Sequence, residues 1–237
     1  MKKSICLNGR IIEYELIHKR VKNINLRIKS DMSVTVSSGS GVPLYVIENF
    51  MTDKADFILA SLDKYSALIK TKPQPISFQN GDIITFLGMP NTLKVQKGAS
   101  NSVCKKDSSI ILTVKDISDI KLKKKVVDAW LREECILYIT ESCKKIYPQF
   151  EKYGVKFPIV KFRKMASRWG SCQARGGIVT FNTSLIKAPK KCIDYVIYHE
   201  FTHFLYADHS KNFYSCLAEF VPDYKECKKE LEKYAAL

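Results

Sequence analysis

Three histidines and one glutamate form the part of the sequence best suited to chemistry. The chain has four histidines, and His199, His203 and His209 fall within one run of eleven residues. His199 and His203 are four residues apart, so on a helix their imidazole rings project from the same face, about one turn apart. Two imidazoles in this arrangement supply half of a tetrahedral zinc site. Glu200 follows the first histidine and can reach a water on the metal without coordinating the metal itself.

His209 is the predicted third ligand. The helix that carries the H-E-x-x-H pattern is expected to end near Ala207 and Asp208, and a turn there could bring His209 back to the metal. Three protein ligands leave the fourth position for water, which distinguishes a catalytic zinc site from a closed structural one. The sequence therefore predicts one zinc ion per chain and a hydrolysis in which Glu200 is the general base.

Alternatives remain for the residues around this site. Asp208 could accept a hydrogen bond from a ligand histidine, or it could cap the end of the helix. Glu219 is the candidate third ligand if His209 does not bind. The pattern could also lie on a solvated helix face without any metal, and its histidines and glutamate would then be ordinary surface residues.

The sequence SRWGSC at residues 167–172 has two interpretations. In the first, an edge strand beside the zinc site binds an extended peptide by strand addition, and Arg168 grips an acidic group or a carbonyl. In the second, Trp169 fills the core and Gly170 permits close packing. We favour the substrate role for Arg168 and the packing role for the other two. On a continuous strand, Lys164 and Arg168 would lie on one face.

Strand-like alternation dominates the first half of the chain. Apolar and polar residues alternate in six segments, as they do in half-buried strands. One amphipathic helix is expected between Pro43 and Leu68, because apolar residues recur there at helical spacing. No internal repeat is visible. The six segments are 11–18, 24–29, 32–38, 83–87, 92–96 and 109–114.

Helical spacing takes over from about Ile117. Pro189 suits the first turn of the helix with the histidine motif, and Ser210 can cap the following helix. Two short strands flank SRWGSC. The sequence therefore predicts an α+β fold with two domains. Residues 1–116 form a β-rich domain with one long helix, and residues 117–237 form the metal-binding catalytic domain, a helical core with a small sheet.

Composition bears on the expected partners. The 237 residues carry a formal net charge of +15, yet only seven of the 39 basic residues are arginine. Arginine is the residue preferred for phosphate recognition, whereas abundant lysine can be a general property of the surface. Acidic residues are also interleaved along the chain. Nucleic-acid binding therefore stays open but is not favoured.

Cysteine usage and hydropathy bear on location. The eight cysteines include no C-x-x-C pair, and none is assigned to the metal; Cys135 and Cys143 are expected in the core. No run approaches the roughly 18 apolar residues of a membrane span. The N-terminal segment lacks the apolar stretch of a secretory signal. These features predict a cytoplasmic protein with reduced thiols and no membrane contact.

The chain resembles the YgjP-like metallopeptidases, which are relatives of the SprT-like proteins and other zincins. The resemblance implies a zinc site at His199, His203 and His209, with Glu200 catalytic. It also implies a β-rich N-terminal part on a minimal zincin core of helices and a small sheet. Tyr214 is a departure, because tryptophan is frequent there in the family. The matching segments are SRWGSC (167–172), FNTSLIKAPKKCIDYVIYHEFTH (181–203) and DHSKNFY (208–214), with KRVKNINLRIKSDMSVTVS and FQNGDIITFLGMPNTLKV in the N-terminal half.

These observations predict a zinc-dependent metallopeptidase that cleaves peptide bonds with a zinc-activated water and Glu200 as general base. In one alternative, the same site hydrolyses a nucleoside triphosphate, with lysines and Arg168 neutralising the phosphates. The chain has no P-loop, which argues only against ordinary NTPase chemistry. In another alternative, the basic surface recruits DNA, as in SprT-like relatives, while the zinc site cleaves bound protein. The expected partner is a polypeptide or a small phosphorylated substrate.

Overall fold

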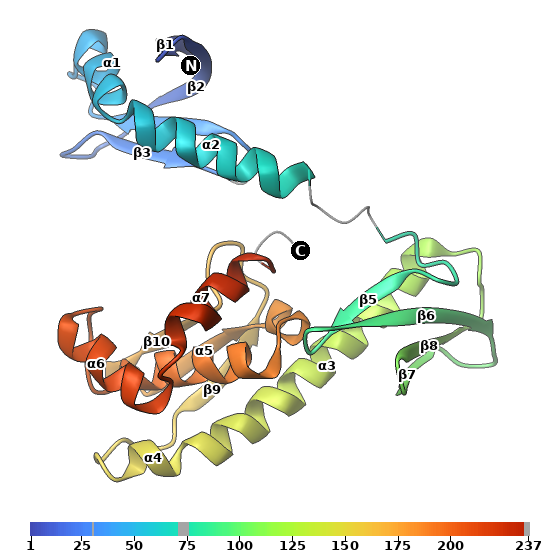
Figure 1. Ribbon diagram of the computed structural model, residues 1–237. Helices are drawn as coiled ribbons and strands as arrows, with labels where there is room; N and C mark the ends of the chain where they lie inside the picture. Colours follow the sequence, from blue (N-terminus) through green and yellow to red (C-terminus); the bar gives the residue numbers. More distant parts are fainter. Residues whose placement is uncertain (30, 71–75, 235–237) are drawn as a thin grey trace. The chain divides into compact units, whose positions relative to one another are not determined.

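The computed structural model describes residues 1–29, 31–70 and 76–234 (Figure 1). Contacts within the chain divide it into two compact units, Met1–Pro73 and Gln74–Ala235. Each unit has its own hydrophobic core. Among the helices described, none combines the length and the apolar character that crossing a membrane requires.

The first unit is a four-stranded sheet packed against two helices. Alternation along the second strand places Ile12, Tyr14 and Leu16 on one face, where they are buried with Ile47 and Ile58 of the helices. The strand order is β1-β2-β4-β3, and β2 and β4 form the parallel pair. The single helix expected in this region is divided in two at Lys54. The elements are β1 (Lys2–Leu7), β2 (Arg10–His18), β3 (Asn25–Ile28), β4 (Val34–Ser38), α1 (Leu44–Asp53) and α2 (Ala55–Lys70).

The second unit begins with a sheet of the same topology. Its order is β5-β6-β8-β7, again with one parallel pair at the centre. In both sheets a turn with positive φ joins the first two strands, at Asn8-Gly9 and at Leu87-Gly88. The fold therefore contains the same arrangement twice, a four-stranded sheet followed by a helix, although no repeat is visible in the sequence. The strands are β5 (Ile83–Phe86), β6 (Met89–Lys97), β7 (Ser102–Lys106) and β8 (Ser109–Val114).

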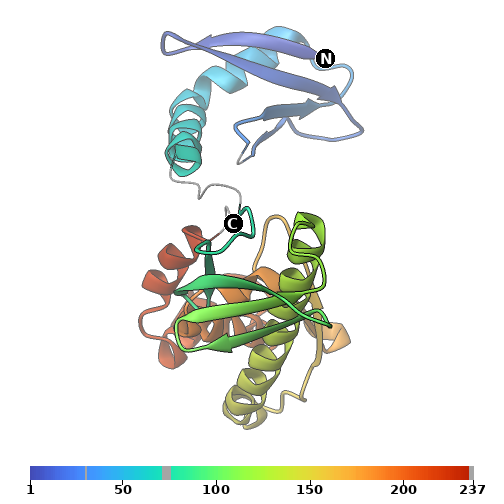
Figure 2. The same cartoon turned by 90° about the vertical axis from the view of Figure 1, so that its right-hand side faces the viewer.

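The remaining elements carry the predicted site. The long helix α3 lies against the second sheet (Figure 2), and Phe86 stacks on Trp130 with ring centroids 5.1 Å apart. A three-stranded sheet follows in the order β10-β11-β9, so β10 forms one of its edges. The elements are α3 (Ile120–Ile146), α4 (Pro148–Glu151), β9 (Ile159–Arg163), β10 (Gly170–Gln173), η1 (Ala174–Gly176), β11 (Ile178–Asn182), η2 (Thr183–Lys187), α5 (Lys190–Thr202), α6 (Lys211–Phe220) and α7 (Tyr224–Glu232).

The α+β prediction is confirmed. Contacts divide the compact units between Pro73 and Gln74, and the domain boundary between residues 116 and 117 stays a prediction. Ile110 and Leu112 of β8 belong to the same buried cluster as Leu131 of α3 and Val196 of α5. Alternation identifies a strand, but it does not say which core the apolar face of that strand joins. The edge strand β7 was not predicted, because most of its residues are exposed and polar.

Candidate metal centre

The helix α5 is fixed near its first turn by the second sheet. The turn between β5 and β6 donates two backbone hydrogen bonds to the segment before α5, from Leu87 N to Ile186 O (2.7 Å) and from Gly88 N to Lys187 O (3.1 Å). Gly88 has a positive φ, and a side chain there would collide with Pro189, the residue before α5. Pro189 lacks an N–H that the first turn would leave unpaired, so it starts the helix without loss.

The three predicted ligands converge at the end of α5. One ring nitrogen from each of His199, His203 and His209 lies within 4.8 Å of the other two. The Nε2 atoms of His199 and His209 are 3.0 Å apart. The buried ring of Phe213 contacts all three imidazoles, with centroid distances of 5.0, 4.7 and 4.9 Å. Ser210 caps α6 through its hydroxyl, as predicted, and so fixes the helix that carries Phe213.

A hydrogen bond to the backbone fixes the tautomer of His203. Its Nδ1 lies 3.1 Å from the carbonyl oxygen of Tyr206, so Nδ1–H donates and the lone pair stays on Nε2. Such a hydrogen bond fixes the tautomer and the ring orientation of a metal-binding histidine. The structure gives this role to the Tyr206 carbonyl and not to Asp208. Glu219, the alternative ligand, is exposed on α6 and is not part of the cluster.

Electrostatics favour the neutral imidazoles that metals bind. Burial lowers the pKa of His199 to about 3, and His203 and His209 act in the same direction. Burial also lowers the pKa of His203. Nδ1 of His199 is buried without a hydrogen-bond partner in the described chain. A tetrahedral zinc ion with bonds of about 2.0–2.1 Å holds its nitrogens roughly 3.4 Å apart, so these three side chains fit the ion.

Glu200 is buried beside the histidines. Only 5% of its surface is exposed, and its carboxylate lies directly against Gly170 at the start of β10. Burial raises the pKa of Glu200 to about 8, and the charge of Arg168 acts in the opposite direction. A divalent cation held by the histidines would favour the ionised carboxylate, which is the form that accepts a proton.

A known protein family matches most of the chain. Residues 22–234 match the family described as YgjP-like, metallopeptidase domain. The chain belongs to the YgjP-like metallopeptidase family. Among solved structures it is similar to the metallopeptidase zymogen of Pyrococcus abyssi abylysin, with 17% identity and a TM-score of 0.36, over 40% of this chain and 93% of that one. No curated protein matches the sequence.

Gly170 sets the position of Glu200 in this YgjP-like site. A Cβ atom on residue 170 would lie 2.7 Å from both Cγ and Cδ of Glu200, and closer still to Oε1. The carboxylate of Glu200 would have to shift away from β10, because the backbone of that strand is held in its sheet. Gly170 therefore has the packing role expected for it, and the group that packs against it is the predicted general base.

Gly170→Ala is expected to lower kcat about 10- to 100-fold, since a displacement of roughly 1 Å at a reacting group has effects of that size. The zinc content should stay at the wild-type level, because no ligand is touched. Gly176→Ala is the matched control: a Cβ there meets only Ile178, at 3.7 Å. If Gly170→Ala keeps full activity, Glu200 does not depend on β10 for its position.

The loop that carries Arg168 is held by Asn182, which the sequence reasoning missed. The Asn182 side chain is buried and donates to the carbonyls of Met165 (2.8 Å) and Arg168 (3.0 Å). It also accepts from Met165 N (3.3 Å) and Ser184 N (3.1 Å). Arg168 and Lys164 thus lie in a loop and not on one continuous strand, so the expectation that alternation places them on one face is wrong.

Asn182→Ala should reduce the free energy of unfolding by about 2–4 kcal/mol, because it leaves several backbone groups without partners. Chemical denaturation of the metal-free protein measures this loss. Asn101→Ala removes a single exposed hydrogen bond to Lys115 N and should change stability by less than about 1 kcal/mol. Equal effects of the two substitutions would show that Asn182 does not organise the loop.

A cleft of about 870 Å³ opens over the histidines and Glu200. Strand β10 lines one wall together with Arg168 and Trp169, and α7 contributes Lys228 and Leu231. Tyr195, one turn before His199 on α5, also lines the cleft. Tyr195 and Lys228 were not predicted. Four-residue spacing places Tyr195 on the helix face of His199 and could have found it, whereas nothing in the local pattern tells which face of α7 meets α5.

Tyr214, the departure from the family pattern, packs beside His209, the predicted third ligand. Its ring stacks on His209 with centroids 6.0 Å apart and on Tyr224 with centroids 5.6 Å apart. The large flat ring at this position therefore supports the third histidine from the side of α6. Cys135 and Cys143 are buried in α3, as expected.

Proposed function

We propose that this metallopeptidase binds one zinc ion through His199, His203 and His209 and uses Glu200 as general base. The observation that carries the proposal is the convergence of three imidazole nitrogens within 4.8 Å, with a buried carboxylate on the adjacent residue. Together with the open cleft above them, this set of donors suits a catalytic metal better than a structural one.

The chain's own groups have separate roles in the proposed peptide hydrolysis. A zinc ion held by His199, His203 and His209 would act as a Lewis acid, activating water and polarising the scissile carbonyl. Glu200 takes a proton from the attacking water on its carboxylate oxygen and returns it to the leaving amine. The backbone at Gly170 holds that carboxylate in place, and Tyr206 O keeps Nε2 of His203 free for the metal.

An extended polypeptide is the substrate that the cleft fits. Strand β10 forms an edge of its sheet and lines the cleft, so a peptide can add to that edge through main-chain hydrogen bonds. Arg168 is exposed at the start of this wall, and its charge reaches Glu200. We assign Arg168 to gripping a carbonyl or an acidic group of the bound chain.

Hydrolysis of a nucleoside triphosphate is the second candidate, because three cationic residues line the cleft: Arg168, Arg175 and Lys228. One experiment separates the two reactions. Zinc-loaded protein is incubated with an unfolded protein and, separately, with the four common nucleoside triphosphates. We expect peptide cleavage and only slow nucleotide hydrolysis. Robust pyrophosphate release that depends on Glu200, without any peptide cleavage, would overturn the peptidase assignment.

The same assay tests the DNA-associated alternative. Duplex and single-stranded DNA are added to the peptide cleavage reaction at physiological salt. We expect no stimulation, because lysine contacts to phosphate weaken steeply as salt rises. A strong stimulation at physiological salt would favour a DNA-recruited peptidase over a free one.

A further inference from the structure

We infer that α5 and α7 form an anion-binding subsite beside the metal centre, which takes an acidic side chain of the peptide substrate next to the scissile bond. Tyr195 and Lys228 are its polar groups, and Val196 and Leu231 are its apolar floor. The inference rests on the proposed peptidase function and adds the chemical class of residue that the peptidase selects.

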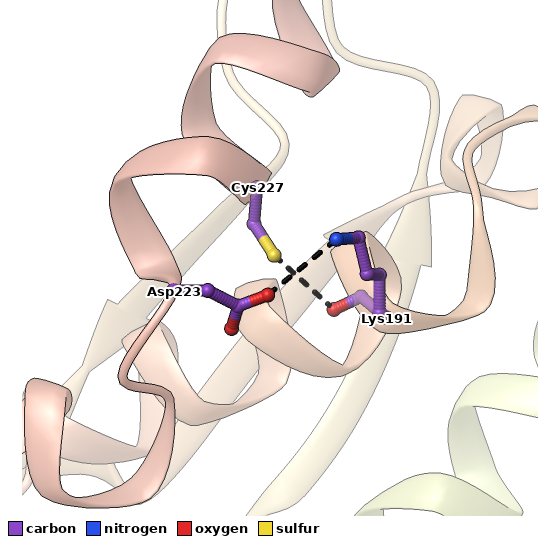
Figure 3. A network of polar contacts seen from close by, with 3 residues as sticks. All are labelled: Lys191, Asp223 and Cys227. Atoms are coloured by element: carbon purple, nitrogen blue, oxygen red, sulfur yellow. Dashed lines mark hydrogen bonds and ion pairs between the residues drawn. The ribbon is translucent and has the colours of Figure 1, made fainter.

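Helix α7 is anchored to α5 at its first turn (Figure 3). The ammonium group of Lys191 lies 3.4 Å from Asp223 Oδ2, and the thiol of Cys227 donates to the Lys191 carbonyl oxygen over 3.9 Å. On α5, Tyr195 lies one turn after Lys191, and His199 lies one turn after Tyr195. On α7, Lys228 directly follows Cys227, and Leu231 lies about one turn after Cys227. The two helices therefore carry these residues to the same side of the metal centre.

Tyr195 is a buried residue with an unused polar group. Only 6% of its surface is exposed, and the edge of its ring contacts the His199 ring with centroids 5.9 Å apart. The residue lines the cleft, and its hydroxyl makes no hydrogen bond within the part of the chain that the structure describes. The hydroxyl oxygen is not among the fully buried polar atoms, so it is accessible to a hydrogen-bond acceptor bound in the cleft.

Lys228 supplies the positive charge. It lines the cleft from α7, and its charge contributes to lowering the pKa of His199. Three cationic residues line the cleft against two carboxylates, one of which is the buried Glu200. The other carboxylate, Glu232, is exposed near the end of α7. The cleft therefore favours an anion over a cation.

A glutamate side chain matches this combination of groups. Its two methylene groups can lie against Val196 and Leu231, and its carboxylate can accept from the Tyr195 hydroxyl and the Lys228 ammonium group. Charge-assisted hydrogen bonds of this kind are stronger than neutral ones. A glutamine of the same shape keeps the apolar contacts and loses the charge, so the pair of side chains isolates the proposed interaction.

The test uses two alanine-rich decapeptides that are identical except for one central glutamate or glutamine. Zinc-loaded wild type should cleave the glutamate peptide next to that residue with a kcat/KM about tenfold higher than the glutamine peptide. Lys228→Glu should reverse this preference and favour a third peptide with lysine. Tyr195→Phe should reduce it about threefold. Lys229→Glu changes the net charge by the same amount as Lys228→Glu but lies outside the cleft, so it should leave the preference unchanged.

Binding gives a readout that does not need turnover. The Glu200→Gln variant should bind the glutamate peptide about tenfold more tightly than the glutamine peptide, as measured by fluorescence anisotropy. Equal affinities for the two peptides, or a preference that survives Lys228→Glu, would overturn the subsite while leaving the peptidase intact. Failure of the wild type to cleave any peptide would overturn the proposed function, and the binding ratio would still decide the subsite.

Discussion

Replacing Glu200 with glutamine is expected to reduce peptide cleavage by about 10²–10⁴-fold, the range that general base catalysis contributes. Glutamine has nearly the same shape, so it can occupy the buried space between α5 and Gly170. Its amide cannot take the proton from the attacking water. The measurement is kcat/KM on an unfolded protein substrate, with wild type and variant matched for zinc content.

Glu219→Gln is the matched control for this substitution. Glu219 is an exposed carboxylate on α6 and is not part of the metal cluster, so its loss should leave the rate unchanged. The decisive companion measurement is the zinc content of the Glu200→Gln protein. If that protein loses its zinc or its fold, Glu200 is a structural residue and the general base must be sought elsewhere.

His203→Ala is expected to weaken zinc binding by more than about 100-fold, because loss of a ligand should exceed the 10- to 100-fold effects known for groups that only orient ligands. Zinc bound to the native state stabilises it by mass action, so the wild-type Tm should rise with zinc concentration. The Tm of the variant should stay nearly constant. Thermal unfolding over a zinc titration measures both effects.

His18→Ala controls for the loss of a histidine elsewhere, because His18 lies on β2 in the first unit. The zinc-dependent rise in Tm should be the same in this variant as in the wild type. His209→Ala should behave like His203→Ala. An undiminished zinc affinity after that substitution would remove His209 from the ligand set and show that the 3.0 Å approach to His199 is unrelated to a metal.

Local spacing in the sequence was enough to predict that His199, His203 and His209 converge. His199 and His203 share a helix face because four residues make about one turn, and this depends on nothing outside α5. Placing His209 required only one further step, a turn that ends before Ser210. Pro189 and Ser210 mark the helix starts through chemistry that is likewise local.

Contacts between distant segments explain what the sequence could not predict. The approach of Gly170 to Glu200 joins β10 to α5 across some thirty residues, and Asn182 holds a loop through backbone groups that carry no pattern. The Tyr206 carbonyl, and not the candidate Asp208, accepts from His203, and a main-chain acceptor leaves no signature in residue type. Strand β8 packs into the core of the second unit, and the alternation of its residues does not specify which core it joins.

X-ray absorption at the zinc edge tests the proposed centre most directly. For zinc-loaded wild type, we predict four nitrogen or oxygen scatterers at about 2.0–2.1 Å, with the multiple scattering of three imidazole rings. His209→Ala should leave the multiple scattering of two rings. Sulfur at about 2.3 Å, as a cysteine ligand would give, or an unchanged number of imidazole rings in His209→Ala, would contradict a three-histidine site.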